Sequence, residues 1–300
     1  MPSSFLGLGI AYSGLTANQR SLQVTSHNIS NANTEGYSRQ RMDTHAYNPD
    51  VLLGGLGTLG NGVEVEAVKQ IRDEFLDYKY RGENAKYGEW DARSSVLKEV
   101  EAIINEPSDS SISEVLDDYF EALHELNKTP ENLTTRTLVR QSAIAVTKQV
   151  NQMSEKLKEL QSDLNFEFNS AVNDLNNKAE QIVELNKVIY ETELEGGTAN
   201  DVRDQRNVLL DEMSELADID YYEDDNNRFH ISLDGTKMVS HFNSTKLELK
   251  PRNEKINEDD AIDLTEVQWE TGQSYTPTSG KLKGLYEARD DIEGDSKGIP

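Results

Sequence analysis

The stretch VNQMSEKLKELQSDLNFEFNSAVNDLNNKAEQIVELNKVIY, residues 150–190, carries the strongest structural signal in the chain. Its apolar residues recur at steps of three and four, which is the seven-residue repeat of a helix with one apolar stripe. The stripe extends from Val146 to Ile189, with an irregular step around Phe168. We therefore expect one continuous helix over residues 134–190, roughly 85 Å long at about 1.5 Å per residue.

Other helical patterns flank this stretch. Residues 72–106 predict a long helix that stops before Pro107, and residues 111–128 predict a shorter helix that ends before Pro130. The segment NDVRDQRNVLLDEMSEL, residues 200–216, predicts a further amphipathic helix. Helices with narrow apolar stripes pack as long antiparallel, coiled-coil-like pairs, so the chain is expected to be elongated.

Two parts of the sequence have strand patterns. Asn61-Gly62 precedes the alternating run VEVEAV, which predicts a β-hairpin with a glycine-rich tip. That glycine-rich segment lacks the Gly-Lys-Ser/Thr ending of a phosphate loop. Near the end of the chain, short alternating runs follow the turn signals Asn226-Asn227 and Asp234-Gly235. The strands expected there are RFHISL, TKMVSHF, TKLELK and EVQWE.

These patterns predict a mainly α fold with a β-rich part, of the α+β class. It contains long antiparallel helices, a β-hairpin and a small distal β-rich domain. Four segments are expected: residues 1–50 as an N-terminal coiled-coil helix with a polar segment, 51–86 as hairpin and connector, 87–195 as a rod of long helices, and 196–300 as a helix with the β-rich domain.

Composition excludes several classes of function. Acidic residues outnumber basic ones 55 to 30, so nucleic acid and anionic membrane surfaces would be repelled. There is no apolar run of about 18 residues to span a membrane, and no charged-then-apolar leader. The chain has no cysteine, so it can form neither a disulfide nor a thiolate metal site. Absence of cysteine suits a protein of the reduced cytosol, and equally a protein secreted unfolded.

The first thirty residues carry a second heptad seam. Large apolar residues occupy one slot, at Leu8, Leu15, Leu22 and Ile29. Small or polar residues occupy the other slot, at Ala11, Asn18, Thr25 and Ala32. Glycines within the stretch weaken an isolated helix, so this seam predicts a helix that needs a partner helix. The alternative is an ordinary core helix of a bundle.

A polar segment, residues 27–37, ends this helix. Asn33 or Gly36 can adopt the left-handed conformation that closes a last turn. His27 has no Cys, Asp or Glu neighbour at ligand spacing, so we expect a surface or capping role for it. The five histidines are scattered and no Gly-x-Ser-x-Gly elbow occurs, so no catalytic residue, metal site or cofactor is predicted.

The segment GLGIAYSGLTANQRSLQVTSHNISNANTEGYSRQR, residues 7–41, resembles the N-terminal signature of flagellar axial proteins. That signature is a helix ending in Asn-Ile-Ser/Ala-Asn-x-Asn-Thr-x-Gly-Tyr-Ser. Residues 60–81 also resemble a stretch shared by the flagellar axial proteins. Three further segments, residues 119–139, 200–216 and 279–290, resemble the flagellar hook-associated protein 1 family, the FlgK type, so that the likeness covers most of residues 3–290.

This resemblance implies a non-enzymatic structural subunit of the bacterial flagellum that joins hook to filament by self-assembly. Family members are exported unfolded, without a cleaved signal peptide, to the extracellular flagellum. The implied partners are further copies of the chain, the hook protein, the next junction protein, and the export apparatus with its chaperone. Because the family pairs its N-terminal helix with a C-terminal helix, we expect this chain to be an N-terminal portion.

The residues predicted to bind partners belong to the seam and to the polar segment. They are Leu8, Leu15, Leu22, Ile29, Asn28, Asn31, Asn33, Thr34, Gly36 and Tyr37. One rival interpretation is a rod or hook subunit, which would lack one continuous helix over residues 134–190. A second is a flagellum-associated glycan hydrolase, which needs two carboxylates about 5 to 9.5 Å apart in a cleft. A third is a free coiled-coil module or secretion chaperone.

Overall fold

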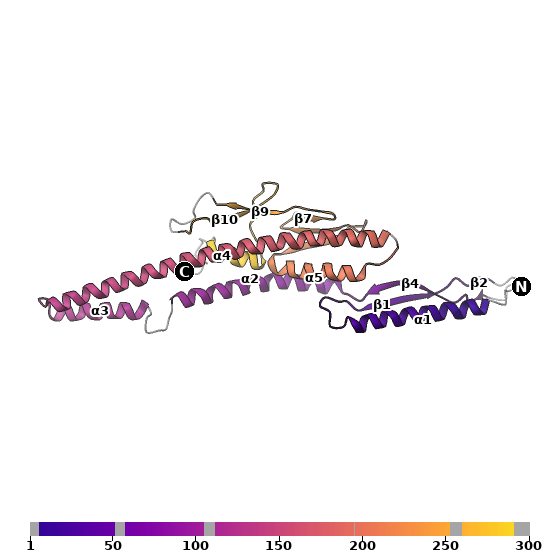
Figure 1. Ribbon diagram of the computed structural model, residues 1–300, viewed down its shortest axis with the longest axis horizontal. Coiled ribbons are helices and arrows are strands. Elements are labelled where there is room, and N and C mark those ends of the chain that lie inside the picture. The colour runs from indigo at the N-terminus through magenta and orange to yellow at the C-terminus, as the bar shows by residue number, and fades with distance from the viewer. Residues whose placement is uncertain (1–5, 52–57, 105–111, 195, 253–259, 291–300) are drawn as a thin grey trace.

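The computed structural model describes residues 6–51, 58–104, 112–194, 196–252 and 260–290, and the molecule is elongated (Figure 1). The N-terminal helix α1 (Leu6–Ser30) and a β-hairpin form one end, and a helical hairpin forms the other. The helices that follow α1 are α2 (Glu74–Ile104), α3 (Ile112–Lys128), α4 (Leu133–Leu194), α5 (Asn200–Leu216) and α6 (Gly280–Asp290). The strands are β1 (Gln40–Ala46), β2 (Asp50–Val51), β3 (Thr58–Leu59), β4 (Val63–Gln70), β5 (Ile219–Glu223), β6 (Phe229–Leu233), β7 (Thr236–Ser240), β8 (Asn243–Ser244), β9 (Leu247–Pro251) and β10 (Thr265–Trp269).

Helix α4 confirms the continuous helix expected over residues 134–190. It runs for 62 residues and forms an antiparallel pair with α3 over its first half. Along its second half it packs against α5 and α6 on one side and against the strands on the other (Figure 1). The mainly α fold with small antiparallel sheets is therefore confirmed.

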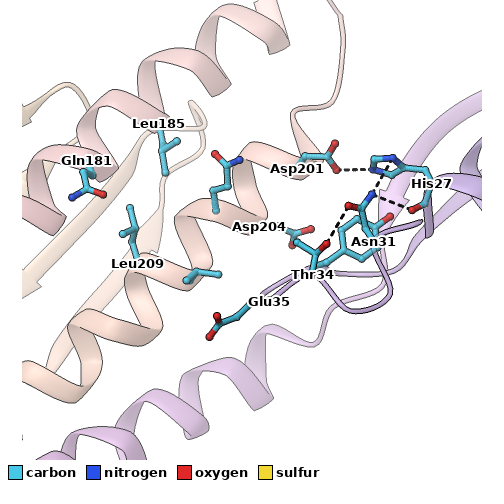
Figure 2. Close-up of a pocket in the computed structure, with 12 residues that line it drawn as sticks. His27, Asn31, Thr34, Glu35, Gln181, Leu185, Asp201, Asp204 and Leu209 are labelled. Atoms are coloured by element: carbon cyan, nitrogen blue, oxygen red, sulfur yellow. Dashed lines mark hydrogen bonds and ion pairs between the residues drawn. The ribbon is translucent and has the colours of Figure 1, made fainter. Parts of the chain in front are cut away.

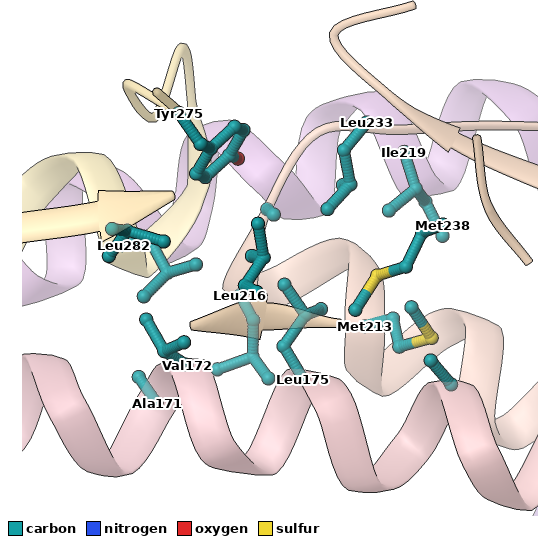
Figure 3. Close-up of a cluster of buried hydrophobic side chains, with 14 of the residues drawn as sticks. Ala171, Val172, Leu175, Met213, Leu216, Ile219, Leu233, Met238, Tyr275 and Leu282 are labelled. Atoms are coloured by element: carbon teal, nitrogen blue, oxygen red, sulfur yellow. The ribbon is translucent and has the colours of Figure 1, made fainter. Parts of the chain in front are cut away.

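A single hydrophobic core joins the helices to the strands. Phe168, Val172, Leu175 and Ile182 of α4 are fully buried in it. Figure 3 shows α4 side chains meeting those of α5 and of the strands. The other large, fully buried side chains are Leu210, Met213, Ile231, Leu233, Met238, Trp269, Leu282 and Leu285. The β-rich part consequently shares its core with the long helices, a relation that the sequence pattern did not reveal.

The strands form a four-stranded antiparallel sheet, in the order β5-β6-β7-β8, and a separate β9-β10 pair. Both predicted turns are present: Asn227, Asp234 and Gly235 have φ values of 57°, 52° and 78°, in the left-handed region that tight turns require. The four predicted strands correspond to β6, β7, β9 and β10.

Side-chain amides of α4 fasten the strands to the helix. Asn176 accepts a hydrogen bond from the backbone N–H of Leu247 at 2.9 Å and donates to its carbonyl at 2.8 Å. Asn186 donates to the carbonyl of His241 at 2.9 Å, and Gln161 accepts from the N–H of Ala261 at 2.7 Å. The edge backbone groups of Leu247 in β9 are thereby satisfied by the helix instead of by another strand, and the bonds to His241 and Ala261 hold connecting segments.

Helix α6 was missed by the prediction, which expected a β-rich end to the chain. Its sequence, GKLKGLYEARD, has two glycines and no long apolar stripe. It is helical because Leu282 and Leu285 are buried in the core, and because Gly284 allows close contact with α2. A side chain at Gly284 would approach the carbonyl oxygen of Glu89 to 2.6 Å.

The predicted β-hairpin is present, but its first strand, β1, lies earlier in the chain than a tight turn at Asn61-Gly62 would place it. β4 begins at Val63, directly after Asn61-Gly62, and pairs antiparallel with β1. Because β1 lies within residues 1–50 and β4 within residues 51–86, the hairpin links the first two predicted segments. Residues 52–57 of the glycine-rich tip lie outside the described residues.

Substituting Leu175 tests the shared core. Leu175→Ala should lower the free energy of unfolding by about 2 to 5 kcal/mol, because it removes buried methyl groups from a fully packed site. Urea unfolding followed by circular dichroism measures this. The control is Ile262→Ala, at a side chain that is 79% exposed, which should change stability by less than about 0.5 kcal/mol. Equal effects of the two substitutions would contradict the shared core.

Candidate assembly interface

The apolar seam of α1 is exposed along the whole helix. Leu8, Leu15, Leu22 and Ile29 have 68%, 56%, 67% and 72% of their surface accessible. Tyr12 beside them is 70% exposed. A row of large apolar side chains in water is unusual for a folded monomer and is typical of a surface that another protein covers. None of the described residues covers it.

The opposite face of α1 packs against β1 and β4. Ala17 is buried there, and Ile10 and Val24 are half-buried. The hydroxyl of Ser13 accepts a hydrogen bond from the N–H of Val63 at 3.2 Å and donates to the carbonyl of Ile10 at 2.8 Å. The hairpin thus supports α1 from behind and leaves the seam facing outward.

Asn28 ties the end of α1 to the start of β1. Its side chain pairs with the backbone of Gln40 much as a strand residue would, accepting from the N–H and donating to the carbonyl, both at 2.8 Å. The hydroxyl of Tyr37 donates to the same Asn28 oxygen at 2.8 Å. Asn28 and Tyr37 were predicted to bind partners, and in this structure both bond within the chain.

The remaining residues of the polar segment form a compact turn. The backbone N–H of Thr34 donates to the carbonyl of Asn31 at 2.9 Å, and its hydroxyl donates to the Asn31 side chain at 3.2 Å. Gly36 has a φ of 72°, in the left-handed region that was expected, but it lies in the turn closed by the Tyr37 N–H on the Thr34 carbonyl and not in the last turn of α1, which ends at Ser30. A side chain at Gly36 would also collide with Val208 of α5. Asn33 is exposed at the surface of the turn.

This turn docks on the N-terminal end of α5. Asp204 is buried and accepts a hydrogen bond from the N–H of Ser38 at 2.9 Å. Asp201 accepts from the side chain of Gln40 at 2.6 Å and lies 3.2 Å from Nε2 of His27 (Figure 2). Carboxylates near a helix N-terminus are favoured by the helix dipole. We call these contacts, between residues 27–40 and the first turns of α5, the joint.

Polar contacts extend the joint to the hairpin and to α2. The side chain of Asn200 donates to the carbonyl of Val68 at 2.8 Å, and Gln70 donates to the carbonyl of Asn200 at 2.8 Å. Further along α5, Arg81 of α2 donates to Asp211 at 2.7 Å. Helix α5 therefore contacts residues 27–40 and the β-hairpin at its N-terminal end, and it contacts α2 further along its length.

A groove of about 570 Å³ lies between the turn and helices α4 and α5 (Figure 2). Leu185, Val208 and Leu209 line it beside His27 and Tyr37. Burial raises the pKa of the Tyr37 hydroxyl, and the negative charges of Asp201 and Asp204 raise this pKa further. Tyr37 therefore remains protonated and can donate to Asn28 at any physiological pH.

The described residues offer neither a metal site nor a membrane span. Among these residues, no group of three or more His, Asp and Glu side chains is placed to hold a metal ion. No helix in the described ranges is both long and apolar enough to cross a membrane.

Comparison with known proteins decides the family. Residues 97–297 match the model of the flagellar hook-associated protein FlgK helical domain, and residues 8–37 match the model of the flagella basal body rod protein. The first match covers about two thirds of the chain and includes α4, α5 and α6. The chain belongs to the FlgK family of flagellar hook-associated proteins.

Individual relatives agree with this assignment. The chain is 38% identical to flagellar hook-associated protein 1 of Bacillus subtilis (strain 168) over 224 residues, which is 73% of this chain and 44% of the relative. It is 29% identical to the protein of the same name from Salmonella typhimurium over 225 residues, 74% of this chain and 40% of the relative. The FlgK family member described here thus spans less than half the length of these relatives.

A solved structure shows the same fold. The flagellar hook junction protein FlgK from Burkholderia pseudomallei superimposes with a TM-score of 0.57 at 18% identity, covering 71% of this chain and 39% of that chain. The fold similarity extends over most of the FlgK family chain described here.

Removing the Asp204 carboxylate tests the joint. In Asp204→Ala, the Ser38 N–H loses its buried acceptor, at a cost of about 1 to 3 kcal/mol. Hydrogen exchange of residues 36–40 should accordingly become roughly 5- to 100-fold faster, as measured by mass spectrometry. Asp225→Ala, at an exposed residue outside the joint, is the matched control. Unchanged exchange in Asp204→Ala would show that the joint does not depend on this bond.

Proposed function

We propose that this chain is the N-terminal part of a structural, non-enzymatic subunit that joins the flagellar hook to the filament. The observation that supports this most directly is the exposed seam of α1, held outward by the hairpin. Membership of the FlgK family of flagellar hook-associated proteins supports a location in the flagellum. The seam is then an assembly surface, and Leu8, Leu15, Leu22 and Ile29 are its contact residues.

Within the subunit, the seam takes a helix as its partner. A heptad of large residues alternating with small ones accepts the large residues of a facing helix. By the family resemblance, that helix comes from the C-terminal portion of the full-length protein, and the completed helix pair packs against neighbouring subunits. The further partners proposed are other copies of the chain, the hook protein and the next junction protein.

The polar segment has a different role in this proposal. Asn28, Asn31, Thr34, Gly36 and Tyr37 bond mainly within the chain, where they set the direction of α1 relative to the rod. Asn33 is exposed at the surface of the turn and can contact a neighbouring subunit.

Export and location follow from the same proposal. The subunit reaches the extracellular flagellum unfolded, through the flagellar export apparatus and with a chaperone, and without a cleaved signal peptide. A chain free of cysteine cannot form mismatched disulfides on the way. Purified protein should be monomeric, whereas a free-standing coiled-coil module would form a stable dimer, and sedimentation distinguishes the two.

Charged residues in the seam test the proposal. Leu15→Asp with Leu22→Asp places two carboxylates where apolar side chains must be buried, so incorporation into flagella should fall below detection and motility should be lost. Immunoblots of isolated flagella and swimming assays measure this. The rest of the molecule, residues 87–300, should remain folded by circular dichroism because both substituted side chains are exposed.

The matched control adds two carboxylates beside the seam. Ser21 and Gln23 are exposed on the flanks of α1, so Ser21→Asp with Gln23→Asp should leave incorporation within about twofold of the unmodified protein. Normal swimming of the Leu15→Asp, Leu22→Asp variant would rule out the seam as an assembly surface.

A further inference from the structure

The α3–α4 hairpin, at the end of the molecule opposite α1, carries opposite charges on its two helices (Figure 1). Helix α3 holds five carboxylates, at Glu114, Asp117, Asp118, Glu121 and Glu125. Residues 133–154 of α4 hold no acidic residue, and their basic residues are Arg136, Arg140 and Lys148. In a chain of net charge −25, this stretch is a local basic surface.

These charges face in opposite directions. The apolar residues of α3 that pack toward α4 are Val115, Tyr119, Ala122 and Leu126. With 3.6 residues per turn, Glu114, Asp117 and Glu121 lie on the outer side of α3, where they are exposed. The same geometry places Arg140 and Lys148 on the outer side of α4, next to Ile144, which is 56% exposed.

The acidic and basic positions are level along the hairpin axis. The chain reverses between Lys128 and Leu133, so residues equally far from this turn lie side by side. Glu121 lies two turns before Lys128, and Arg140 lies two turns after Leu133. By the same spacing, Glu114 is level with the turn that contains Lys148.

We propose that neighbouring copies of this chain pack side by side through this hairpin, the acidic outer face of α3 in one copy lying on the basic outer face of α4 in the next. A sideways translation with no shift along the hairpin brings Glu121 against Arg140 of the neighbour. Arg140 and Lys148 form no ion pair with any other described residue, so both can bind a neighbour. Such a head-to-tail contact repeats from copy to copy and closes into a ring when the rotation permits.

This inference rests on the proposed function, because surface ion pairs are individually weak and act together only where copies are held side by side. The contact between α3 of one copy and α4 of the next is separate from any contact made by the α1 seam. The occupant is a second copy because the hairpin itself carries both of the complementary faces.

Cysteine cross-linking tests the contact, since the native chain has no cysteine. The full-length protein with Glu121→Cys and Arg140→Cys is incorporated into flagella, which are then oxidised. The two positions lie on opposite sides of one hairpin, so a disulfide, whose Cα atoms must lie within about 7 Å, forms only between copies. We expect a ladder of dimers, trimers and higher species on non-reducing gels.

The matched control is Glu121→Cys with Asn151→Cys, which moves the second cysteine about 16 Å along the outer face of α4. This pair should yield no ladder. Equal ladders from both pairs, or none from either while the protein is present in flagella, overturns the hairpin contact and leaves the proposed function standing. Absence of the unmodified protein from flagella counts against the proposed function instead.

Exchanging the charges gives an independent result. Glu121→Arg alone and Arg140→Glu alone should each lower the number of incorporated copies at least threefold, because like charges then face each other between copies. The double variant should recover at least half of the unmodified level. Failure of the double variant to exceed the single variants overturns the proposal, even when both singles are defective.

Discussion

The structure depends on one long helix that offers a continuous burial surface. Helix α4 runs for 62 residues, and a helix with a narrow apolar stripe is stabilised mainly by packing of that stripe against other elements. Its second half is buried by α5, α6 and the strands, and its first half is covered on one side by α3. The apolar side chains supply the burial, and the amides of Gln161, Asn176 and Asn186 supply hydrogen bonds that align the strands.

The seam of α1 and the polar segment that follows it differ in chemistry, and this separates assembly from positioning. Contacts of the polar segment lie within the chain and end on Asp201 and Asp204 of α5. Contacts available to the seam are apolar and face solvent. The asparagine-rich polar segment thus fixes the orientation of α1, and the exposed seam lies on a different face of this helix.

Sequence reasoning succeeded where a periodic pattern carries the information. The repeat of α4 predicted a continuous helix, and Asp234-Gly235 predicted a turn, because these signals are local. The tight turn predicted at Asn61-Gly62 was wrong, since the strands on either side of it, β3 and β4, pair with β2 and β1 and not with each other. The seam of α1 was also predictable from its heptad spacing, whereas the second face of this helix, where Ile10, Ala17 and Val24 pack against the β-hairpin, was not predicted. The family was predicted through the signature that contains Asn28 and Gly36 and through the resemblance of later segments.

Features that depend on tertiary contacts could not be predicted from local sequence patterns. Helix α6 has weak intrinsic propensity and is fixed by Gly284 against α2 and by Leu285 in the core. The joint needs Asp201 and Asp204, which are separated from the signature by more than 160 residues. Ordinary acidic residues in an acidic chain give no sign that they will meet Ser38 and Gln40.

The length of α4 has a mechanical consequence for the joint. At about 1.5 Å per residue the helix is roughly 93 Å long, so it acts as a lever with its pivot beside α5. A rotation of about 5° at the pivot displaces the far tip by about 8 Å, on the order of one helix diameter. A small change of angle at the joint, which includes the bond of Ser38 to Asp204, would therefore cause a large change in the position of the far tip relative to α1.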